Sequence, residues 1–344
     1  MRPQDLPMPS TPLPAHVPIT VVFRGHHPEN IHHGSLAVVN AKGQLLASVG
    51  DVNAALYTRS ALKPFQAMPL IARAAQRLKL DDADIALLCA SHSGEPMHVE
   101  RAASLLARIG ADESALACGT HVPFFFGATG TAPAPGSRFT RLHHNCSGKH
   151  TGMLLLADSL GAPLSDYLEP SHPVQQEIAR SVGHFTGVPV HLLVRGTDGC
   201  SAPNYAVPLR ALAHGFAQLT VTDPDPVYGD APLRIAHAMS RNPELVSGQG
   251  RNDLALMRAG RGDWVSKVGA DGVQALASFS RGIGIAAKVG DGQLAPLMVA
   301  FVSALEQLGW LDDESRAALA SLIPPPLKNA AGREVGEMRA VLKL

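Results

Sequence analysis

Strand-like segments stand at both ends of this chain, and their placement limits the folds that it can form. Residues 19–24 alternate and are β-branched, which predicts a strand, and residues 335–342 predict a closing strand. Residues 35–50 predict two strands around a turn at 40–43, and residues 264–279 and 284–289 predict strands separated by Gly-rich turns. We therefore expect a sheet that the two ends of the chain complete together.

Helical patterns are interleaved with these strands. Seven segments have helical apolar spacing: residues 63–80, 99–109, 147–160, 173–185, 206–219, 231–240 and 297–307. Short apolar runs at 85–89 and 190–194 predict two more strands, and residues 118–138 predict a loop. Because no linker interrupts residues 19–344, we expect one α/β (α+β) domain, with room for a helical lobe at about 95–185.

Composition and charge narrow the class of protein. Lys and Arg number 29, as do Asp and Glu, so nothing indicates electrostatic binding of nucleic acid or of an anionic membrane. Residues 1–18 hold six prolines and no apolar run, which predicts a flexible arm rather than a secretory signal. We expect a cytoplasmic protein without a membrane partner. Its four cysteines are then expected to be thiols or metal ligands: Cys89, Cys118, Cys146 and Cys200.

The first chemical motif is Ser60-Ala-Leu-Lys63. A spacing of three places both side chains on one face of a helical turn, where the lysine amine can reach the serine hydroxyl. A serine needs a base to become a good nucleophile, and lowering a lysine pKa from about 10.4 to about 7–8 for that task costs about 4 kcal/mol. Nearby Arg59 could supply part of the positive charge that this requires. Such a motif arises by chance roughly once in a chain this long, so it carries little weight alone.

Two further motifs follow in order. Residues 91–96, Ser-His-Ser-Gly-Glu-Pro, form a polar turn between an apolar segment and a helix, and Lys267-Val-Gly269 lies on a predicted strand. The order Ser-x-x-Lys, Ser-x-Ser or Ser-x-Asn, Lys-x-Gly is that of penicillin-recognising serine hydrolases, although Ser93 stands where Asn is usual and the usual Thr after the lysine is missing. A capped turn and a solvent-facing lysine are the alternative interpretations.

The fourth motif is the run His143-His-Asn-Cys-Ser-Gly-Lys-His150. Its Cys and His residues suggest a metal site, which Cys200 could join, yet no Cys-x-x-Cys pair supports an ordinary structural zinc site. The other interpretation is a Gly-rich turn that opens the helix at 147, with Cys146 simply buried. The residues alone leave both open.

Taken together, these motifs resemble the bacterial L-asparaginase family of the Ser-Lys type, which is unrelated in sequence to the threonine-nucleophile asparaginases. The resemblance spans roughly residues 20–295. It rests on stretches that include 24–25, 29–34, 50–51, 59–66, 90–96, 144–150, 196–201 and 267–272.

The resemblance implies a serine β-lactamase-like and glutaminase-like fold, mainly an antiparallel sheet packed with helices, and a homodimer. It implies two catalytic pairs, Ser60 with Lys63 and Ser91 with Lys267, although Lys288 also lies on a late strand. It further implies a zinc site formed by Cys146, Lys149 and Cys200. In addition, Arg59, His150 and Asp198 are expected to bind or orient the substrate.

The implied reaction is the hydrolysis of L-asparagine to L-aspartate and ammonia, with Ser60 as nucleophile and Lys63 as base. A glutaminase is the nearest alternative, because one methylene separates the two substrates by only about 1–3 kcal/mol. A penicillin-recognising peptidase or lactamase fits less well without a secretory signal. A non-catalytic amino-acid- or zinc-binding protein is the alternative from another class.

Overall fold

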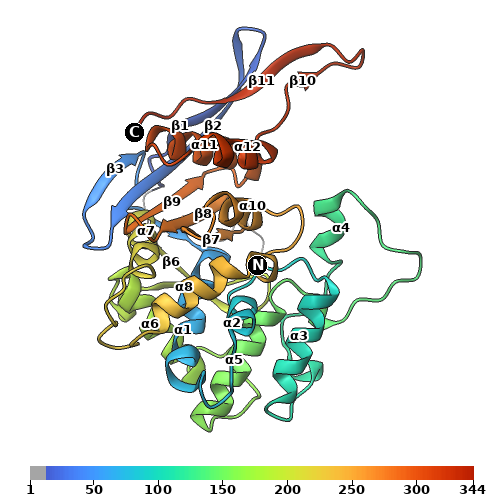
Figure 1. The fold of residues 1–344 in the computed structure, drawn as a ribbon, viewed down its shortest axis with the longest axis vertical. Helices are drawn as coiled ribbons and strands as arrows, with labels where there is room; N and C mark the ends of the chain where they lie inside the picture. The colour runs from blue at the N-terminus through green and yellow to red at the C-terminus, as the bar shows by residue number, and fades with distance from the viewer. Residues whose placement is uncertain (1–12) are drawn as a thin grey trace, which may run out of the picture.

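A computed structural model describes residues 13–344 of the chain, and its main sheet joins the two ends as expected (Figure 1). Strand β1 (Val17–Arg24) pairs antiparallel with β11 (Glu334–Ala340) on one side and with β2 (His27–Asn40) on the other. The described residues form an eight-stranded sheet in the order β10-β11-β1-β2-β9-β8-β7, with β3 paired to β2. Every pairing in it is antiparallel, so the expected class, a mainly antiparallel sheet packed with helices, is confirmed.

The other strands of this sheet are β3 (Leu45–Val49), β7 (Trp264–Gly269), β8 (Val273–Ser278), β9 (Ile283–Val289) and β10 (Leu327–Lys328). A second, three-stranded sheet has the order β4-β6-β5 and consists of β4 (Ala55–Tyr57), β5 (Val194–Thr197) and β6 (Pro203–Pro208). The sequence patterns did not predict β4 or β6, and the predicted strand at 190–194 is a 3₁₀ turn at Val190–Leu192 followed by β5.

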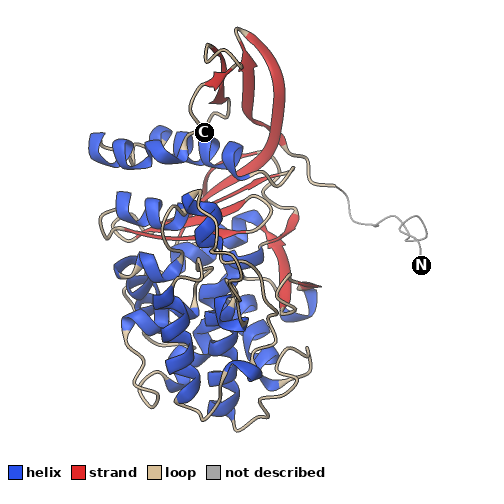
Figure 2. Cartoon of the chain, turned by 90° about the vertical axis from the view of Figure 1, so that its right-hand side faces the viewer, coloured by secondary structure: helices blue, strands red, loops and turns tan. Residues whose placement is uncertain are grey.

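Helices cover both faces of the main sheet, and the strand sequences explain why (Figure 2). Successive residues of a strand point to opposite faces. On β2, Ala37 and Val39 join the core beneath helix α7 (Leu209–Gln218), whereas Leu36 and Val38 join the core beneath helix α11 (Leu294–Gln307). Because both sets are apolar, the strand is buried on both sides and the domain has three layers.

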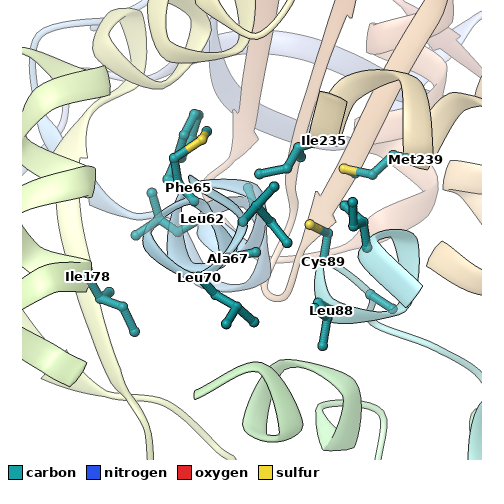
Figure 3. Packing of buried hydrophobic residues seen from close by; sticks show 14 of the residues in the cluster. Leu62, Phe65, Ala67, Leu70, Leu88, Cys89, Ile178, Ile235 and Met239 are labelled. Carbon is teal, nitrogen blue, oxygen red and sulfur yellow. The ribbon is translucent and has the colours of Figure 1, made fainter. Parts of the chain in front are cut away.

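The larger core surrounds helix α1 (Lys63–Ala74), which is buried along nearly its whole length (Figure 3). Phe65 packs against Phe185 and Phe216, with ring centroids 5.4 and 5.7 Å apart. Helix α5 (Ser147–Leu160) crosses the same layer and is buried from Ser147 to Ala157. A helix buried on every side must satisfy any charge that it carries inside the protein.

The remaining helices are α2 (Asp82–Leu88), α3 (Pro96–Ala107), α4 (Phe124–Thr129), α6 (Pro173–Thr186), α8 (Ala231–Arg241), α9 (Pro243–Val246), α10 (Asn252–Ala259) and α12 (Asp313–Leu319). The strand predicted at 85–89 is wrong, because this segment is the end of α2. Asp81 caps that helix by accepting a hydrogen bond from the backbone N–H of Asp84, whose side chain bonds back. Helices α4, within the predicted loop, and α10 were also missed.

The expected arm at 1–18 is only partly visible. Residues 1–12 lie outside the described part of the chain, while Val17 and Pro18 already belong to β1. Among residues 13–344, no helix combines the length and the apolar character needed to cross a membrane.

Candidate active site

A cavity of about 450 Å³ opens where the β7–β8 turn meets the helical layer. Segments far apart in the sequence build its wall, so it exists only in the folded chain. The lining residues that matter below are Arg59, Ser60, Ser91, His121, Phe124, His144, Cys146, Asp198, Cys200, Arg251 and Asp271.

Lys63 lies beneath this cavity with a fully buried side chain. Its Nζ atom donates to Ser91 Oγ at 2.9 Å, to the carbonyl of Ala90 and to Cys146 Sγ at 3.3 Å. Ser60 is one 3₁₀ turn before Lys63 and also lines the cavity. Among the described residues its hydroxyl makes no side-chain hydrogen bond, so the lysine amine is directed to Ser91 rather than to Ser60.

Lys267, the expected partner of Ser91, is fully buried on β7 and forms an ion pair with Asp253 of α10, with 3.2 Å between Nζ and Oδ2. Asp253 also accepts hydrogen bonds from Ser266, Gln274 and the backbone N–H of Val268. Burial lowers the pKa of Lys267 to about 8; the Asp253 carboxylate opposes this change and the charge of Lys63 adds to it. Burial thus shifts the pKa of Lys267 toward neutral pH, at a site where the charge of Lys63 acts on it.

Lys149 and the two expected cysteine ligands lie together, all buried. Lys149 Nζ donates to Cys200 Sγ at 2.8 Å. The contact with Cys200, followed by the charges of Lys63 and Lys149, holds the pKa of the Cys146 thiol well below its usual range despite burial. Burial opposes the charge of Lys149, but the neighbouring sulfurs and Asp198 raise its pKa.

Arg59 has a left-handed backbone, with φ of +53°, and its guanidinium bridges two carboxylates. It contacts Asp198 at 2.8 Å and also pairs with Asp271. Burial alone would raise the pKa of Asp198, but Lys149 and Arg59 keep it below its usual value. This double ion pair fixes the residue directly before Ser60.

Two of the residues considered in the sequence analysis, His150 and Lys288, do not line the cavity. His150 is fully buried behind the cavity wall, where its Nδ1 contacts the Tyr167 hydroxyl at 2.6 Å, and burial lowers its pKa to about 4. Lys288, the alternative second lysine, is half-buried on β9 and donates to the carbonyls of Asp271 and Val289. Of the two late lysines, Lys267 is the one enclosed beside Lys63.

Sequence patterns missed Arg251, Phe124 and His121 in this wall. Their side chains form a row of contacts that ends at His144 of the fourth motif. The Arg251 guanidinium lies 4.9 Å from the Phe124 ring centre, Phe124 lies 4.7 Å from His121, and His121 lies 4.4 Å from His144. The one sequence signal for Arg251 was its position after the glycine pair in Ser247-Gly-Gln-Gly250.

The donor atoms of the expected zinc site are of types that zinc binds, because Cys146 and Cys200 supply sulfur and Lys149 supplies nitrogen. The buried Nε2 atom of His150 has no hydrogen-bond partner among residues 13–344 and lies in the same region. In this part of the chain, no three His, Cys, Asp or Glu side chains gather closely enough to hold a metal. A bound zinc would therefore depend on Lys149, which must lose its proton to coordinate.

The fold and the cavity define a class: an α/β protein with an antiparallel sheet whose substrate-sized cavity contains two serines above buried lysines. The chain matches the L-asparaginase II family over residues 20–340 and belongs to it. It is accordingly a hydrolase of the amidohydrolase kind.

More distant similarities were found among solved structures. The native form of Mglu shares 14% identity over 81% of this chain and 66% of that chain, with a TM-score of 0.45. A β-lactamase from Mycobacterium bovis shares 16% identity over 85% of this chain and 95% of that chain, with a TM-score of 0.39. No curated protein matches the chain.

The ion pair of Lys267 can be tested by its effect on pH dependence. Asp253→Asn removes the carboxylate that favours the charged form of Lys267, so the pKa of this lysine, about 8, should fall further. We expect an inflection near pH 8 in kcat/KM for amide hydrolysis that moves to lower pH in the variant. Ser266→Ala, which removes a hydrogen bond but no charge, should leave it in place. An inflection that stays near pH 8 in Asp253→Asn would contradict this assignment.

Proposed function

We propose that the protein is an L-asparaginase that hydrolyses the side-chain amide of L-asparagine through a serine nucleophile activated by lysine. The observation that carries the proposal is the buried Lys63, whose amine is hydrogen-bonded to one cavity serine, Ser91, and lies one turn from another, Ser60. Family membership supports the reaction class.

In this mechanism Ser60 Oγ attacks the amide carbon while Lys63, whose amine turns from Ser91 toward Ser60, acts as the base that takes the hydroxyl proton. The proton passes through Ser91 to the amide nitrogen, which leaves as ammonia. Water then hydrolyses the β-aspartyl ester and restores Ser60. Ser60 is proposed over Ser91 because its hydroxyl is not already engaged by the lysine among the described residues and faces the cavity.

The other predicted residues take supporting roles in this proposal. Lys267 holds or supplies a proton near the leaving ammonia, since Asp253 keeps it in place beside Lys63. Arg59 and Asp198 line the cavity and orient the substrate. His150 acts indirectly, because it supports the Cys200 side of the wall from behind.

We further propose that Cys146, Lys149 and Cys200 hold a zinc ion beside the pocket. When bound, zinc would supply a Lewis acid that orients the substrate, because a serine already provides the nucleophile. Following the sequence resemblance, we also propose that the protein is a homodimer, that it is cytoplasmic, and that it acts on a small-molecule substrate.

The substrate assignment is tested by the release of ammonia from L-asparagine and L-glutamine, measured side by side with the purified protein. We expect kcat/KM for asparagine to exceed that for glutamine by about 10- to 100-fold, the range that one methylene provides. Faster turnover of glutamine would make the protein a glutaminase. Absence of ammonia from both would leave a binding protein and refute the proposal.

The nucleophile is tested by two matched serine variants. Ser60→Ala should lower kcat by at least about 10³-fold and prevent any covalent acyl-enzyme, because the attacking oxygen is gone. Ser91→Ala should slow turnover yet still form the acyl-enzyme, which mass spectrometry of rapidly quenched samples would place on Ser60. Ser137→Ala, in an exposed loop, is the control. Acylation of Ser91 in a working Ser60→Ala variant would reverse the assignment.

The zinc proposal is tested by metal analysis after dialysis against zinc. We expect about one zinc per chain in the native protein and little in Cys200→Ser or Lys149→Met, because each change removes one donor from a small set. Cys89→Ser, at a buried cysteine outside the set, should keep the metal. Equal zinc content in all four proteins would contradict the site.

A further inference from the structure

The cavity is lined by two guanidinium groups that differ in their partners. Arg59 bridges both lining carboxylates, Asp198 and Asp271. Arg251 makes no ion pair or side-chain hydrogen bond with any residue of the described chain, and its contact is the face of Phe124 at 4.9 Å. The cation of Arg251 is therefore available to a ligand in the cavity.

Two glycines bring Arg251 to this position. Gly248 and Gly250 have φ of +99° and +70°, a region that side chains other than glycine rarely adopt. A Cβ atom on Gly248 would lie 2.3 Å from Glu95 Oε1, and one on Gly250 would lie 2.5 Å from the carbonyl of Ala128. The 247–251 segment thus packs closely against the 91–95 turn and against α4, so Arg251 is held at the cavity rather than directed into solvent.

The stacked side chains hold the guanidinium in one orientation. Phe124 lies between Arg251 and His121, and the ring of His121 contacts the tilted ring of His144. A guanidinium on an aromatic face keeps its N–H edge free for hydrogen bonds.

The charges of the lining have a simple consequence. Arg59 and, from below, Lys149 face the carboxylate of Asp198, whereas Arg251 has no carboxylate partner among the described residues. The carboxylate of a free amino acid would supply the partner that Arg251 lacks. Guanidinium groups bind carboxylates through two parallel hydrogen bonds.

We propose that Arg251 binds the α-carboxylate of the substrate and thereby restricts the enzyme to amides of free amino acids. The inference rests on the proposed function, since it assigns a substrate group to the same cavity. Arg251 is a binding residue in this scheme and takes no part in proton transfer.

The test compares L-asparagine with β-alaninamide, which is asparagine without its α-carboxylate. Arg251→Ala should lower kcat/KM for asparagine about 100-fold, as expected for the loss of a charge-assisted hydrogen-bonded pair, and change that for β-alaninamide by less than about threefold. Arg251→Lys should fall in between, because it keeps the charge without the paired donors. Arg258→Ala, on helix α10 directly after Arg251 but paired with Glu244 at the surface, is the matched control and should act like the native protein. Equal losses on both substrates, or no loss on asparagine, would overturn the inference.

A binding measurement separates this inference from the reaction itself. Calorimetry would compare L-aspartate with β-alanine, which lacks the α-carboxylate, in the native protein and in Arg251→Ala. We expect aspartate to bind the native protein at least 10-fold more tightly than β-alanine, and this preference to vanish in the variant. A native protein that binds aspartate in this way but releases no ammonia would refute the proposed function and keep the inference. A preference that survives in Arg251→Ala would refute the inference and leave the proposed function unaffected.

Discussion

Three lysines buried under one cavity are the constraint on which this structure depends. Lys63, Lys149 and Lys267 are each at most 3% exposed, and an ammonium removed from water costs several kcal/mol unless partners replace the solvent. Among the described residues, Lys267 alone forms an ion pair with a carboxylate. Lys149 has a sulfur, and Lys63 has a carbonyl, a hydroxyl and a sulfur. The fold thus gathers three buried amines below the serines of the cavity, an arrangement typical of functional sites rather than of stabilising ones.

The layers of the fold explain how these charges are held. Lys63 begins α1 and Lys149 lies in the first turn of α5, two helices that are buried on nearly every side, while Lys267 lies on β7 at the edge of the main sheet. Each element is rigid because its apolar residues fill both surrounding cores. Several side chains that line the cavity come instead from turns: Ser91, Asp198, Asp271 and Arg251. Rigid elements therefore supply the three buried lysines, and turns supply much of the cavity wall.

Local patterns predicted much of this arrangement and long-range contacts account for what they missed. Strand alternation predicted the joining of the two chain ends, and helical spacing placed Ser60 one turn before Lys63, although the lysine amine is directed to Ser91. The run at 85–89 is short and apolar, so its pattern fits a strand or a buried helix, and the capping box at Asp81 is the local signal for the helix. Asp253 was missed because α10 was not predicted. Its partners Ser266, Lys267 and Gln274 lie on β7 and β8, later in the chain, so local patterns could not show them. The pairing of Lys63 with Ser91 could not be read from spacing, because 28 residues separate them.

Ser60 and Ser91 differ in the contacts that hold them. Ser91 is tied to its surroundings twice, through its side chain to Lys63 and through its backbone N–H to the carbonyl of Val246. Ser60 follows Arg59, whose two ion pairs hold the backbone around it, and its hydroxyl makes no side-chain hydrogen bond with residues 13–344. A nucleophile must move toward the carbon that it attacks, whereas a proton carrier works best when it stays in contact with its base. This difference between the two serines supports the proposal that Ser60 attacks the amide and Ser91 transfers the proton.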